Sequence, residues 1–114
     1  MTQTIGAKLT EILSDIALIF ENQAGSEDMP YIVYTLDLEP TYCKDGISKL
    51  SGTLMLYIYA GDAETAISLK DSVIEAVAEN MQGGGYRSRI RSATSDDNDG
   101  IYSQTLEYFI AQLS

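Results

Sequence analysis

The chain has 114 residues, of which 45% are hydrophobic and 21% charged, and it contains no His, no Trp and one Cys. This length and apolar content exclude general disorder and suit one two-layer core, so we expect residues 1–114 to form a single domain. No apolar run approaches the ~20 residues of a membrane-spanning helix, and the net charge of −10 disfavours binding to nucleic acid or to an anionic membrane. The isolated Cys43 is predicted to be an inert loop thiol.

The first half of the chain is predicted to form a helix and two strands. Apolar residues recur at three- and four-residue steps from about Ile5 to Glu21, which predicts an amphipathic helix with Thr4 as its N-cap. Two-residue alternation then predicts a strand from Tyr31 to about Glu39 and another from about Lys49 to Ala60. The segment 40–47 contains Pro, Asp and Gly and is predicted to be the loop between them.

The second half repeats this order of one helix and two strands. Asp62 is predicted to cap a helix that stops at the glycines 83–85, because glycine adopts helix-ending conformations cheaply. Strands follow from Tyr86 to about Ala93 and from Ile101 to Leu113, with a hairpin loop over 95–100. The predicted fold class is α+β, a two-layer α/β sandwich in the order α-β-β-α-β-β, with a mainly antiparallel four-stranded sheet and both helices on one face.

The predicted helices are too few to cover both faces of the sheet. Two helices side by side span roughly 20 Å, about the width of four strands. We assign them the even-numbered face of the first two strands, continued by Leu106, Tyr108 and Ile110, with Ile90 as the main contribution of the third strand. The opposite face carries Tyr, Met and Arg, which are enriched in protein–protein interfaces. We predict self-association through that face or through a sheet edge, with these candidate interface residues: Met55, Tyr57, Tyr59, Arg87, Arg89 and Arg91.

The alternating arginines from Arg87 to Arg91 are open to three interpretations. They could form a solvated strand face that pairs with Glu107 or other acids across the sheet. They could form an interface in which the guanidinium groups meet carboxylates of a neighbour or stack on Tyr57 and Tyr59. Phosphate contact is the third interpretation, and the acidity of the rest of the chain disfavours it.

The residues that could carry chemistry favour structural explanations. The acidic segment 96–100 departs from the spacing of a calcium-binding loop, and the glycines 83–85 follow a helix instead of forming a phosphate-binding loop. Without His, a nucleophile has no ordinary general base, and the carboxylate pairs Asp37/Glu39 and Glu75/Glu79 are predicted to be solvated. We therefore predict no enzymatic activity, no cofactor and no metal. The alternatives are a small dimeric α/β ligand-binding or regulatory module, and a metal-dependent hydrolase that uses carboxylates alone.

Four segments of the chain follow one another in an order that is typical of one protein family. A first helix and a short polar loop precede the strand Met29-Pro30-Tyr31-Ile32-Val33-Tyr34. A long strand ends in Leu54-Met55-Leu56-Tyr57-Ile58-Tyr59-Ala60, a helix starts at Asp62-Ala63-Glu64, and a strand from Tyr102 to Ile110 closes the chain. Over nearly its whole length, the chain resembles the phage tail-terminator (tail-completion) family of long-tailed phages.

This resemblance implies an α/β sandwich that assembles as a ring, typically a hexamer, on the end of a completed tail tube. The ring would meet the tail tube protein and present a surface to the head–tail connector protein, while DNA passes through its centre without specific binding. It implies a structural protein of a virion or prophage, located in the virion tail and in the host cytoplasm during assembly. The family has no catalytic signature, so the resemblance implies no active-site residues.

Overall fold

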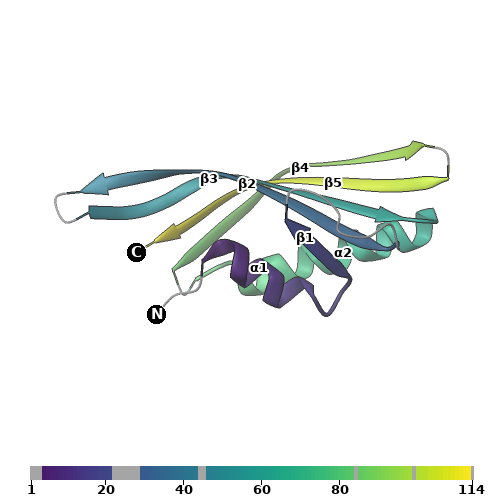
Figure 1. The fold of residues 1–114 in the computed structure, drawn as a ribbon, viewed down its shortest axis with the longest axis horizontal. Coiled ribbons are helices and arrows are strands. Elements are labelled where there is room, and N and C mark those ends of the chain that lie inside the picture. Colours follow the sequence, from purple (N-terminus) through teal and green to yellow (C-terminus); the bar gives the residue numbers. More distant parts are fainter. Residues whose placement is uncertain (1–3, 22–28, 44–45, 84, 99, 114) are drawn as a thin grey trace.

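The chain folds into one sheet with two helices beneath it (Figure 1). The computed structural model describes residues 4–21, 29–43, 46–83, 85–98 and 100–113. The elements in chain order are α1 (Ile5–Leu13), β1 (Leu18–Glu21), β2 (Tyr31–Cys43), β3 (Gly46–Ala60), α2 (Ala63–Asn80), β4 (Tyr86–Asn98) and β5 (Ile101–Leu113). Both predicted N-caps are confirmed: Thr4 accepts a hydrogen bond from the Ala7 amide at 3.2 Å, and Asp62 accepts one from the Thr65 amide at 2.7 Å.

The predicted fold class is wrong in its sheet. The sheet has five strands in the order β1-β2-β3-β5-β4, and it is mixed because β1 runs parallel to β2 while the other neighbours are antiparallel. The additional strand, β1, comes from a segment that the sequence pattern places in the first helix. That helix ends at Leu13, eight residues before the predicted end at Glu21.

The chain leaves the helix through a tight turn. The amides of Ile16 and Ala17 both donate to the Leu13 carbonyl, and the Ser14 hydroxyl donates to the Glu11 carbonyl at 3.2 Å. The residues that follow, from Leu18 to Glu21, include an isoleucine and a phenylalanine, which favour strands. A short apolar run fits helical and strand periodicity equally well, so the pattern alone could not separate the two.

Both hairpins are longer than the sequence predicts. The predicted loop over 40–47 is mostly strand, since β2 runs to Cys43 and β3 begins at Gly46. Cys43 is therefore a strand residue, and its side chain lies outside the described part of the structure. The predicted loop over 95–100 is also mostly strand, because β4 continues to Asn98 and leaves a turn at Gly100, whose φ is +80°. The β2–β3 hairpin extends beyond the helices (Figure 1), whereas the β4–β5 hairpin lies near the start of α2, where Ala63 and Ile67 line a hollow with Ser95, Asp96 and Tyr102.

The core lies between the helices and one face of the sheet. As predicted, this face carries the even-numbered residues of β2 and β3, and Leu106, Tyr108 and Ile110 of β5 are buried with them. Leu9 and Leu13 of α1 and Val73 and Val77 of α2 close this core from below. The predicted contribution of Ile90 is wrong, because its side chain is 41% exposed. It points to the helix side, opposite Tyr108, but α2 packs against β3 and β5 and leaves most of the edge strand β4 beyond its cover.

Two buried tyrosines allow the same substitution to be tested in two environments. Tyr34 donates a hydrogen bond to Glu21 Oε2 at 2.7 Å, whereas the Tyr108 hydroxyl has no partner among the described residues. We expect Tyr34→Phe to lower the free energy of unfolding by about 1 kcal/mol, because it removes a hydrogen bond to a carboxylate. We expect Tyr108→Phe to leave it unchanged or raise it by up to about 1 kcal/mol, because an unpaired buried hydroxyl is unfavourable. Denaturant titration measures both, and an equal loss in the two variants would contradict this explanation.

Tyr108 also predicts an alkaline loss of stability. Burial raises its pKa from 10.0 to about 12, so the folded chain favours the neutral phenol more than the unfolded chain does. The stability linked to this group is complete below pH 10 and is lost as the pH rises from 10 to about 12. Over that range, Tyr108→Phe should show a shallower fall in the free energy of unfolding than the unsubstituted chain. Identical pH profiles would contradict the prediction.

Candidate functional site

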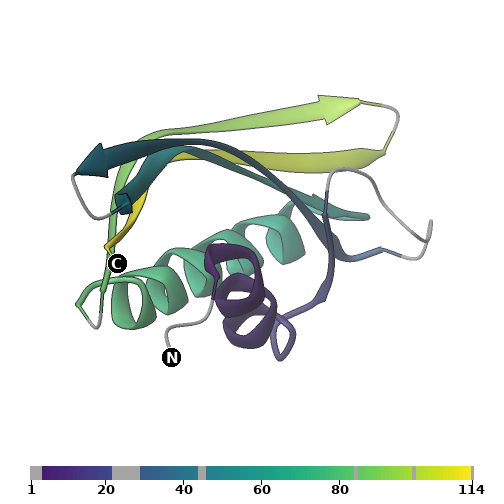
Figure 2. The same cartoon turned by 60° about the vertical axis from the view of Figure 1, so that its left-hand side comes forward.

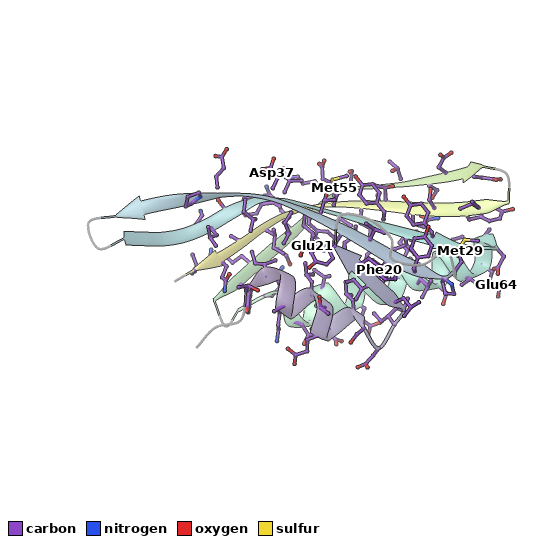
Figure 3. The ribbon with its side chains drawn as sticks, in the orientation of Figure 1. Phe20, Glu21, Met29, Asp37, Met55 and Glu64 are labelled. Carbon is purple, nitrogen blue, oxygen red and sulfur yellow. The ribbon has the colours of Figure 1, made fainter. Side chains whose placement is uncertain are left out.

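The face of the sheet opposite the helices is the candidate functional site. In Figures 1 and 2 both helices lie on the same side of the sheet, and no described helix or strand covers the other side. We call this side the outer face; Asp37 and Met55 project from it (Figure 3). The strand register places these residues on it: Leu18 and Phe20 of β1, the odd-numbered residues from Tyr31 to Glu39 of β2, from Ser51 to Tyr59 of β3 and from Ser103 to Ala111 of β5, and Arg87 and Arg89 of β4.

One end of the outer face carries an aromatic cluster of Phe20, Tyr31 and Tyr59. The rings of Phe20 and Tyr31 meet edge to face at 6.2 Å, and those of Tyr31 and Tyr59 lie 5.1 Å apart. Tyr57 lies next to this cluster, and the pKa of Tyr59 is raised by burial and then by the neighbouring Tyr31 and Tyr57. The sequence did not predict that Phe20 lies on the outer face, because its pattern placed Phe20 in the buried stripe of a helix. Only the pairing of β1 with β2 brings it to this face.

The three arginines lie along the opposite border of the outer face, on the edge strand β4, and all three are exposed. The register of β4 shifts between Ile90 and Ser92, which makes Arg91 the extra residue of a β-bulge. Its guanidinium carbon lies 5.5 Å from the centre of the Phe109 ring, a cation–π arrangement. Gln82, just after α2, donates from its side-chain amide to both the carbonyl and the hydroxyl of Ser88, which ties the arginine segment to the end of that helix.

The bulge and the strand order exclude two of the contacts predicted for the arginines, the pairing with Glu107 and stacking on the tyrosines of the same chain. Glu107 lies opposite Ser92 on β4 and Met55 on β3, so no arginine is its cross-strand partner. The aromatic ring that Arg91 reaches belongs to Phe109 of β5, because β5 separates the arginines from the tyrosines of β3. The structure thus places all six predicted interface residues on one face, in two separate groups. Their part in an interface stays a prediction.

Two rows of residues cross the outer face and connect its acidic and basic borders. One row runs Asp37, Thr53, Phe109, Arg89, and the next runs Glu39, Ser51, Ala111, Arg87. A surface hollow between the borders is lined by Asp37 and Glu39 on one side and by Arg91 and Phe109 on the other. A second hollow lies against Arg87, Arg89 and Gln82. Both hollows could take polar or charged groups of a partner.

The other features singled out in the sequence lie in strands or at the end of a helix. No group of three or more His, Cys, Asp or Glu residues in these ranges could hold a metal ion. Asp96 and Asp97 lie in β4, paired with Ser103 and Tyr102, instead of in a loop. Gly83 has a φ of +88°, which fits its predicted place after the second helix. Neither described helix combines the length and apolar character needed to span a membrane.

Comparison with known proteins shows likeness in structure alone. No protein-family model and no curated protein matches the sequence. A chain from the virion of the native gene transfer agent particle superposes with a TM-score of 0.55 at 12% identity, covering 93% of this chain and 84% of that one. The gp17 protein of bacteriophage SPP1 also superposes with a TM-score of 0.55, at 16% identity, covering 96% of this chain and 88% of gp17. At these identities the likeness establishes the fold, and it extends over almost the whole chain.

Proposed function

We propose that the chain is a structural protein of a phage or phage-like particle. In this role it caps the end of the tail tube as a ring and forms the tail-side joining surface for the head connector. The observation that carries the proposal is the shared fold over 93% and 96% of the chain with a component of a gene transfer agent virion and a bacteriophage protein. The resemblance of its segments to tail-terminator proteins, found in the sequence, leads to the same function.

The surface and charge of the molecule suit this role. The outer face combines exposed arginines with partly exposed tyrosines and a methionine, which are the side chains that anchor interfaces. An assembly that covers this face would remove that surface from water. The net charge of −10 would repel the phosphates of DNA passing through a ring, so DNA would not adhere to its wall.

The proposal is tested on tail tubes assembled from the tail tube protein of the same genome. With the chain present, electron microscopy should show ring-shaped density at one tube end, and tube growth should stop. Without it, the tubes should continue to lengthen. Tubes of equal length in both samples, with bare ends, would contradict the proposal.

A double substitution on the outer face should weaken capping. We expect Tyr57→Ala with Arg89→Ala, which removes one member of each predicted group, to raise the concentration needed to cap half of the tubes at least tenfold, because interface tyrosines and arginines carry much of the binding energy. The matched control is Tyr102→Ala with Lys70→Ala, two partly exposed residues on the helix side of the molecule. Equal capping by the two double variants would place the contact outside the outer face.

A further inference from the structure

The two long borders of the outer face carry charges of opposite sign. Among the described residues, β1 pairs with β2 from Tyr31 to Tyr34, and no described strand pairs with the outer side of the remainder of β2, where Asp37 and Glu39 are exposed. The opposite border is β4, where Arg87 and Arg89 are exposed. These two arginines are among only seven basic residues in a chain with 17 acidic ones. The part of β4 from Arg87 to Arg91 holds three of the seven basic residues, while the exposed Asp96 and Asp97 lie further along the same strand.

The charges at the two borders are also in register. Asp37 shares its cross-sheet row with Arg89, and Glu39 shares the next row with Arg87. Three strand spacings separate the borders, about 14 Å. If a second copy lies beside the first with the same face outward, its acidic border meets the basic border of the first, row against row. The strand directions in the sheet make β4 of one copy antiparallel to β2 of the next.

Both borders carry features that oppose unlimited strand pairing. Pro40 lies in the border part of β2 and has no amide hydrogen to donate, and β4 contains the bulge at Arg91. Charged side chains, proline and bulges are the usual means by which edge strands avoid aggregation. A contact between these borders would therefore depend on side chains, and complementary charges would select the partner and fix the register.

We infer that successive copies of the chain join head to tail, with Asp37 and Glu39 of one copy against Arg87 and Arg89 of the next. The inference rests on the proposed ring and names the surfaces that form it. A contact between two different patches closes into a ring when the rotation from copy to copy completes a circle. Such a contact uses both borders of every copy, so no basic border is left free within a closed ring.

Charge reversal tests this contact. The acid-border variant carries Asp37→Arg and Glu39→Arg, and the basic-border variant carries Arg87→Glu and Arg89→Glu. Each variant alone brings like charges together, so we expect its self-association to weaken at least about a hundredfold, as measured by light scattering against concentration. An equimolar mixture should recover assemblies of more than two copies, because each altered border then meets its complement. Circular dichroism of each variant checks that it is folded.

The control is a reversal of two exposed acids on the helix side, Asp71→Arg with Glu75→Arg, which should assemble like the unsubstituted chain. The inference would be overturned if either border variant assembled alone as well as the control, or if a mixture of folded variants stayed monomeric. A mixture that forms dimers only would also overturn it, because a head-to-tail pair leaves a border free at each end and should add further copies. In each of these cases the unsubstituted chain still caps tubes if the proposed function is correct. An unsubstituted chain that neither associates nor caps tubes would contradict the proposed function itself.

Discussion

Replacing Gly52 with alanine should destabilise the chain by about 3 kcal/mol, near the upper end of the range for added volume at a closely packed position. Gly52 lies in β3 opposite Leu38 of β2. A Cβ atom at this position would lie 1.9 Å from the Asp37 carbonyl oxygen and 2.9 Å from its carbon. These are backbone atoms, so the clash cannot be relieved by moving a flexible side chain. The β2–β3 pair would have to separate at the segment that presents Asp37 and Glu39.

The matched control is Gly61→Ala, which adds the same methyl group at a position with nothing within 4 Å. We expect the free energy of unfolding of this variant to be within about 1 kcal/mol of that of the unsubstituted chain, because the added methyl group meets no neighbour and alanine also restricts the unfolded chain. Both variants are compared by denaturant titration at one chain concentration, because association would change the apparent stability. A Gly52→Ala variant as stable as Gly61→Ala would contradict the close approach of β3 to the Asp37 backbone of β2.

The second large effect is expected at the end of α1. Leu13 is the last residue of this helix and has no exposed surface. Leu13→Ala should lower the free energy of unfolding by about 3 kcal/mol, because it removes buried methyl groups and leaves a cavity in the core. Thermal and denaturant unfolding at one fixed concentration both measure this loss.

Leu18→Ala is the matched control, because the same atoms are removed from a side chain that is 53% exposed in β1. We expect a change of less than about 1 kcal/mol, as for most surface substitutions. Similar losses for the two variants would indicate that the segment from Leu13 to Leu18 is packed differently, for example as one continuous buried helix.

The sequence predicted the elements whose periodicity is set by one buried face. Apart from the buried Val33, the odd-numbered residues of β2 and β3 that alternate with the core positions are polar or partly exposed, because the helices cover the even-numbered side alone. The second helix and both N-caps followed from the same kind of local signal, since Asp62 and Thr4 bond to amides three residues further on. These features depend on neighbours in the chain and therefore appear in the sequence.

The sequence could not predict features that depend on distant pairing. The four residues of β1 become a strand because β2 offers a parallel partner, and nothing within the segment distinguishes it from a helix end. The end of the β2–β3 hairpin extends beyond the helices, and the end of β4 from Ser95 to Asn98 is polar throughout, so neither shows the apolar alternation that marks a strand. Ile90 was assigned to the core from its position in an alternating strand, but the helices do not extend to that edge.

The candidate site was predicted in its composition but not in its arrangement. Alternation placed Met55, Tyr57 and Tyr59 on the outer face, and the arginines on the same side. The contact of Arg91 with Phe109 depends on a bulge, which no local pattern marked. The opposition of acidic and basic borders emerges only from the order of the strands, because β5 lies between β3 and β4.

The proposed ring requires each chain to associate with further copies of itself, and the inferred contact lies at the two borders of the sheet. Light scattering over a range of chain concentrations measures this directly, because it gives the mass of the assembly. We predict a single defined mass that is an integer multiple, greater than two, of the mass of one chain. The mass of one chain at every concentration, unchanged when tail tubes are added, would contradict the account.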